Sequence, residues 1–239
     1  MTNRQSNIIF YSAVALFVIV ALTNVYYPQL FEGFTKSDQE LQIKEAMAKT
    51  EYDKALALYG EMVNDKVAQG ESSTAETAQL YQEIAEIYAL QGNSEQERQY
   101  YLKALPIREK LQEKDRYSLA KVNFQLGKIA RQENRLDQAQ QYFEKSLFAR
   151  LGFVDLPESV DQGMFTKLQQ QRINYKRLNH AETIAAFQQL AEVHVDKEDY
   201  QAAKDYYQRA RSASVEVFGE DSAQVVAFSK LLEELPSQN

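Results

Sequence analysis

Four segments of the sequence share an aromatic residue at one position and recur at a regular interval. The aromatic residues are Tyr59, Tyr101, Phe143 and Tyr207, so the intervals are 42, 42 and 64 residues. Four residues before the aromatic, three of the segments have alanine, whereas the second has Glu97; the alanines are Ala55, Ala139 and Ala203. A fixed period of this length predicts stacked copies of one supersecondary unit, each too small to bury its apolar face alone.

A second pattern precedes each segment in constant phase and has the spacing of an amphipathic helix. In the second unit, Tyr81, Ile84, Ala85 and Tyr88 fall at i, i+3, i+4 and i+7. The corresponding apolar or small residues later in the chain are Leu126, Gly127, Ala130, Phe187, Leu190, Ala191 and His194. The small residues, Gly127 among them, are expected to let the paired helices approach closely. Only 8 glycines and 4 prolines occur in 239 residues, which favours long helices over many short strands. The sequence therefore predicts an all-α fold of paired helices.

These residues resemble the tetratricopeptide repeat (TPR), and the 42-residue period with KALPIREKL at 103–111 is similar to the kinesin-light-chain type. The resemblance covers residues 36–235 and implies a solenoid of four helix pairs. The unpaired segment 225–235 is expected to cap it, and residues 236–239 form a tail. The longer third interval places an insertion within residues 151–179. Ile43, where a small residue is expected, and Glu97 depart from the pattern.

Two serines have the capping-box spacing that is typical of helix starts. Ser37 precedes Glu40 by three residues, and Ser73 precedes Glu76 by three. Helices are therefore expected to begin immediately after Ser37 and Ser73.

The N-terminal region predicts a single transmembrane helix. No charged residue occurs between Gln5 and Phe31, and residues 8–27 would span about 30 Å as an α-helix, the thickness of the hydrocarbon core of a bilayer. We interpret residues 1–7 as a tail, 8–27 as an uncleaved signal anchor and 28–35 as a linker. The alternatives are a cleaved signal peptide, for which residues 21–23 are a poor cleavage site, and a buried core helix.

The orientation of this span follows from the few charges beside it. Arg4 and the α-amino group precede the span, which favours a cytoplasmic N-terminus. The repeat domain is then predicted outside the cytoplasm, which in a bacterium is the periplasmic side of the inner membrane.

Composition argues against several classes of function. The net charge of −7, from 34 acidic and 27 basic residues, is unlike that of a nucleic-acid binder. The chain has no cysteine and only two histidines, and it lacks phosphate-loop, zinc-protease and calcium-loop motifs. We expect His194 to be a core residue and His180 to be exposed near a helix start. The sequence thus predicts no enzyme, cofactor, metal site or small-molecule substrate.

Two groups of basic residues are candidate docking sites. In proteins that this array resembles, the first helix of each pair lines a groove, and the third unit would contribute Lys121, Phe124, Lys128 and Arg131. Such a set can hold a peptide carboxylate while Phe124 covers an apolar side chain, although it lacks the lysine and asparagine pattern of chaperone-binding repeats. The alternative is an exposed basic face with one stray aromatic residue. The second group is Lys167, Arg172, Lys176 and Arg177, in an acid-free stretch of the insertion that is either a docking surface or a solvated helix face.

The predicted function is a membrane-anchored, non-catalytic scaffold or adaptor that binds a partner protein or peptide through the TPR groove. The alternative is a structural or assembly subunit of a larger membrane protein complex. Such a subunit would dock through its edges and the basic insertion.

Overall fold

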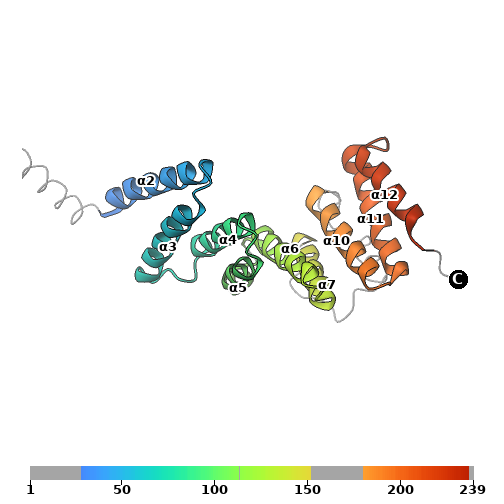
Figure 1. Cartoon of the computed structure of the whole chain (residues 1–239), viewed down its shortest axis with the longest axis horizontal. Coiled ribbons are helices and arrows are strands. Elements are labelled where there is room, and N and C mark those ends of the chain that lie inside the picture. The colour runs from blue at the N-terminus through green and yellow to red at the C-terminus, as the bar shows by residue number, and fades with distance from the viewer. Residues whose placement is uncertain (1–27, 113, 152–179, 237–239) are drawn as a thin grey trace, which may run out of the picture. The chain divides into compact units, whose positions relative to one another are not determined.

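The structure is a computed structural model, and it describes residues 28–112, 114–151 and 180–236. This part of the chain is helical and contains no strand, which confirms the all-α prediction for the described residues (Figure 1). The helices are α2 (Pro28–Ala48), α3 (Tyr52–Ala68), α4 (Ala75–Leu90), α5 (Ser94–Lys110), α6 (Arg116–Gln132), α7 (Leu136–Leu151), α10 (Ala181–Asp196), α11 (Tyr200–Phe218) and α12 (Ala223–Glu234).

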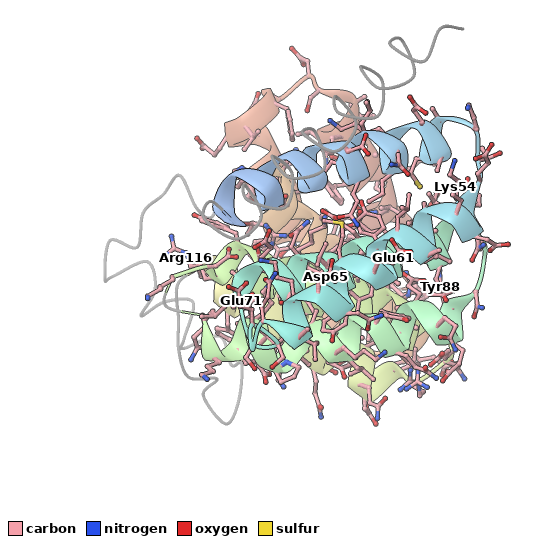
Figure 2. The ribbon with its side chains drawn as sticks, turned by 90° about the vertical axis from the view of Figure 1, so that its left-hand side faces the viewer. Lys54, Glu61, Asp65, Glu71, Tyr88 and Arg116 are labelled. Carbon is pink, nitrogen blue, oxygen red and sulfur yellow. The ribbon has the colours of Figure 1, made fainter. Side chains whose placement is uncertain are left out.

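The described residues fall into two compact units whose boundary lies between Asn64 and Asp65. In the first unit, Ile43, Ala46 and Ala55 are buried. Exposed charged side chains, including Lys54 and Glu61, stand along α3 (Figure 2).

Two helix starts differ from the sequence prediction. Helix α2 already begins at Pro28, so residues 28–35 are helical and Ser37 lies inside the helix. Helix α4 is capped by Thr74 and not by Ser73, since the Thr74 hydroxyl accepts the backbone N–H of Thr77 at 3.2 Å.

The second unit is a stack of helix hairpins. Helices α4 and α5, α6 and α7, and α10 and α11 form the pairs, α5 contacts α6, α7 contacts α10, and α12 packs on α11 (Figure 1). This arrangement confirms the TPR-like solenoid and the capping position of the last helix. The first helices of the pairs (α4, α6 and α10) are called the A helices below.

The same left-handed turn joins the two helices of each pair. Thr50, Gly92, Asn134 and Glu198 occupy equivalent positions, with φ between 56° and 71°. The next residue then donates its backbone N–H to a carbonyl five residues earlier, as Asn93 does to Tyr88 at 2.9 Å. This geometry satisfies the free carbonyls at the end of the first helix, and glycine adopts it with the least strain.

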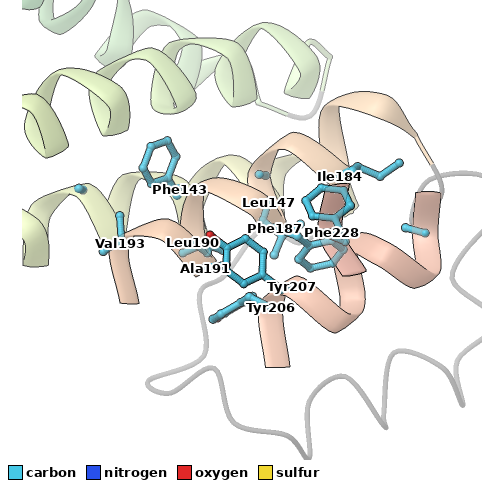
Figure 3. Close-up of a cluster of buried hydrophobic side chains, with 14 of the residues drawn as sticks. Phe143, Leu147, Ile184, Phe187, Leu190, Ala191, Val193, Tyr206, Tyr207 and Phe228 are labelled. Carbon is cyan, nitrogen blue, oxygen red and sulfur yellow. The ribbon is translucent and has the colours of Figure 1, made fainter. Parts of the chain in front are cut away.

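The repeated aromatic and alanine positions form the core of the second unit. Tyr101, Phe143 and Tyr207 are at most 4% exposed, and Ala139 and Ala203 are fully buried. The largest apolar cluster of the described residues joins α7, α10, α11 and α12 and includes Ala130 of α6 (Figure 3). A Cβ atom added at Gly127 would lie 2.7 Å from Cε1 of Phe143, which confirms the close helix approach expected at this glycine.

A basic residue in or near the last turn of three consecutive second helices binds the start of the next A helix. These residues are Lys66, Arg108 and Arg150, and their spacing is again 42 residues. Lys66 Nζ lies 2.9 Å from Glu76, Arg108 lies 2.7 Å from Asp115, and Arg150 pairs with Glu182. We call these the junction cations. The equivalent position before α12 holds Ser214.

The predicted span at residues 8–27 and most of the predicted insertion lie outside the described residues. Within the described ranges, no helix combines the length and apolar character that crossing a bilayer requires.

Candidate functional site

The four groove residues predicted from the sequence all lie on α6, but only two of them are exposed. Asp115 starts this helix, because its carboxylate accepts the backbone N–H of Ser118 at 3.2 Å. Lys121 and Lys128 are exposed, whereas Phe124 and Arg131 are half-buried. The predicted set therefore divides by burial into two exposed lysines and two half-buried side chains.

Lys121 and Arg131 form ion pairs with the two adjacent A helices. Lys121 Nζ lies 2.6 Å from Glu86 of α4, and Arg131 Nε lies 2.6 Å from Asp196 of α10. Arg131 also binds Glu192 of α10. Burial disfavours the charge of Arg131, but the hydrogen bonds and charges of Asp196 and Glu192 outweigh it and raise its pKa. These contacts join three consecutive repeats across the A-helix face.

Phe124 belongs to the core more than to the surface. Its ring lies 5.5 Å from that of Phe143 in an edge-to-face arrangement and packs against the largest apolar cluster. Only part of the ring is therefore accessible to cover a ligand side chain.

A hollow of about 360 Å³ lies between α6 and α10 and is lined by Lys128, Arg131, Gln132, Gln189 and Asp196. Within the described residues, Lys128 forms no ion pair, unlike Arg131 beside it. Its charge acts at longer range on Glu97 of α5, where desolvation raises the pKa and Lys128 partly opposes that rise. Of the three basic residues in the predicted set, Lys128 is thus the one that lines the hollow without an ion pair to a described residue.

Sequence reasoning missed Gln132 and Gln189 in this hollow. Gln132 is four residues after Lys128 on the same helix, so helical spacing could have indicated it. Gln189 could not be found in this way, because its position depends on how α10 packs against α6. The junction cations were also missed, although their 42-residue spacing is visible in the sequence.

The two histidines lie where the sequence places them. His180 is exposed and caps the start of α10. His194 is 8% exposed, stacks on Tyr206, and lies with Nδ1 3.1 Å from the carboxylate of Asp199. Among the residues that the structure describes, no cluster of three His, Asp or Glu side chains could hold a metal ion. The second predicted docking set, Lys167, Arg172, Lys176 and Arg177, lies outside those residues.

Comparison with protein families identifies the repeats. Two family models described as tetratricopeptide repeat match residues 76–147 and 183–224. These matches run from α4 into α7 and cover most of α10 and all of α11, so the chain contains TPR repeats. No curated protein matches the sequence.

Solved structures share the fold at low sequence identity. BtubC (BKLC) from P. vanneervenii is similar with a TM-score of 0.60 and 20% identity, over 90% of this chain and 77% of that chain. The nearly identical TPR-like repeats assigned to a kinesin light chain of Podosopora anserina give a TM-score of 0.59 and 14% identity, over 82% of both chains. The chain therefore shares its helical-repeat fold with these structures, and TPR repeats typically mediate protein–protein interactions.

Proposed function

We propose that this protein is a membrane-anchored, non-catalytic scaffold that binds a segment of a partner protein in the groove along its A helices. The hollow between α6 and α10 is the observation that supports this site, because it combines an exposed cation with two side-chain amides. A lysine can bind a carboxylate, and glutamine amides can both donate and accept hydrogen bonds with a peptide backbone. The anchor is residues 8–27, and it holds the repeats close to the membrane on the side opposite the cytoplasmic N-terminus.

Site-specific photo-crosslinking in intact cells tests the groove. A photoreactive residue is placed at Gln132, which lines the hollow, and at Lys204, an exposed position on α11, as the matched control. We expect one partner to crosslink from position 132 and not from position 204, and Lys128→Ala to abolish that crosslink. Equal crosslinking from both positions, or a crosslink indifferent to Lys128→Ala, would refute groove binding.

The alternative function, an assembly subunit, predicts a different pattern. A photoreactive residue at Lys176 in the insertion would then capture a neighbour in fixed stoichiometry, while position 132 captures none. The anchor is tested separately by carbonate washing of membranes and by N-terminal sequencing. We expect the mature chain to stay with the membrane and to begin at Met1 or Thr2; a soluble chain that begins near Asn24 would contradict the anchor.

A further inference from the structure

The carboxylate of Glu192 receives three side-chain donors in the groove. Gln188 donates from Nε2 to Oε1 at 2.8 Å, and Gln189 donates from Nε2 to Oε2 at 2.9 Å. Arg131 donates to Oε2 as well, across the interface between α6 and α10. A guanidinium and two amides around one carboxylate are the groups with which a protein recognises an acidic ligand.

This carboxylate site adjoins the hollow. Arg131 and Gln189 bind Glu192 and also line the hollow, together with Lys128. The Glu192 side chain is 21% exposed, so it can turn toward solvent without the unfolding of α10. Arg131 and Gln189 are therefore shared by the Glu192 site and by the hollow that Lys128 also lines.

The charges around the hollow are balanced while Glu192 is bound. Lys128 and Arg131 supply two positive charges, and Glu192 and Asp196 supply two negative charges. An acidic side chain that enters the hollow gains little net attraction in this state. When Glu192 turns away, one uncompensated positive charge and three donors become available.

We propose that Glu192 occupies the carboxylate site of the groove as an internal competitor, and that an acidic side chain of the partner segment binds by replacing it. This inference rests on the proposed groove function and specifies the chemistry of the partner: an extended segment that carries Asp or Glu. The affinity for the partner is then reduced by the cost of displacing Glu192. Segments with few acidic residues would therefore bind weakly.

The substitution Glu192→Gln tests this exchange. A glutamine at position 192 has the same size, but it replaces one acceptor oxygen with an NH₂ group that faces the donors of Gln188 or Gln189. The control is Glu83→Gln on α4, which removes the same charge from a side chain that accepts from Gln79 and does not contact Arg131. The probe is a fluorescent peptide of ten glutamates, with ten lysines as the reverse-charge peptide, bound to the full-length protein in detergent at low salt.

We expect Glu192→Gln to bind the glutamate peptide about tenfold more tightly than the wild type, equivalent to about 1.4 kcal/mol. Glu83→Gln should change the affinity by less than about threefold, which is the general effect of one lost charge. Adding Lys128→Ala to Glu192→Gln should remove most of the gain. In a second readout, propionate should raise the melting temperature of Glu192→Ala more than chloride at equal ionic strength, and it should not do so for the wild type.

Equal effects of Glu192→Gln and Glu83→Gln, or no gain in either, would overturn the internal-competitor inference. So would the absence of propionate rescue, which would make Glu192 a structural link between repeats only. The proposed groove function is tested separately, by the Lys128-dependent crosslink from position 132.

Discussion

Replacing Gly127 with alanine should destabilise the protein, even though alanine is the better helix former. The new Cβ would lie 2.7, 2.8 and 3.0 Å from three atoms of the Phe143 ring. That ring is fully buried and also packs edge-to-face on Phe124, so it has little freedom to move away. Either α6 and α7 must separate or the aromatic cluster must rearrange.

The expected net effect follows from two opposing contributions. Overpacking a core typically costs about 1–3 kcal/mol, and three contacts at or below 3.0 Å place this case in the upper part of that range. The higher helix propensity of alanine relative to glycine stabilises the folded state by about 1 kcal/mol. We therefore expect Gly127→Ala to lower the free energy of unfolding by about 1–2 kcal/mol.

Gly60→Ala is the matched control, because Gly60 is also inside a helix but a Cβ there would have no neighbour within 4 Å. It should stabilise the protein by about 0.5–1 kcal/mol through helix propensity alone. Urea unfolding followed by far-UV circular dichroism measures both. If Gly127→Ala raises the midpoint as Gly60→Ala does, the close packing of Gly127 on Phe143 is wrong. Adding Phe143→Leu should recover part of the loss if the ring is the obstacle.

Three further predictions concern the turns, the junction cations and the buried histidine. Glu198→Gly should stabilise the protein by about 0.5–1 kcal/mol, since Glu198 has a φ of 60° that glycine adopts without strain; an unchanged urea midpoint would contradict this. Arg108→Ala should cost about 3 kcal/mol in the same assay, because the 2%-exposed Arg108 side chain donates to Gln82 at 2.7 Å and pairs with Asp115 at 2.7 Å, and both residues would lose these contacts. Burial lowers the pKa of His194 below 6.5, although its carboxylate partner opposes this shift. The unfolded chain therefore binds the proton more readily than the folded chain, and the free energy of unfolding decreases as the pH drops below about 6.5. His194→Gln should reduce this loss between pH 7 and pH 5, and equal pH dependence in both proteins would rule out His194 as its source.

The repeat period by itself determined the fold class and the faces that are buried. Aromatics at 42-residue intervals and alanines four residues earlier fix which side of each helix packs inward, because side-chain position along a helix follows from local geometry alone. The same reasoning placed Gly127 at a close helix contact and His194 in the core. It failed at the first helix, because the chain from Pro28 is helical where a linker is expected. It also could not recognise the junction cations, whose period is visible but whose partners are not.

Only the tertiary structure decided what the basic face of α6 does. Arg131 and Phe124 share a helical face with Lys128, so the sequence predicts the same role for all three. In the fold, Arg131 is held by Asp196 and Glu192, which follow it by 65 and 61 residues, and Phe124 packs into the aromatic cluster. Helical periodicity specifies the direction of a side chain from its own helix axis, but not the distance and rotation of the next helix. Those depend on the packing of α7, α10 and α11, and they leave Lys128 exposed at the hollow while its neighbours are bound.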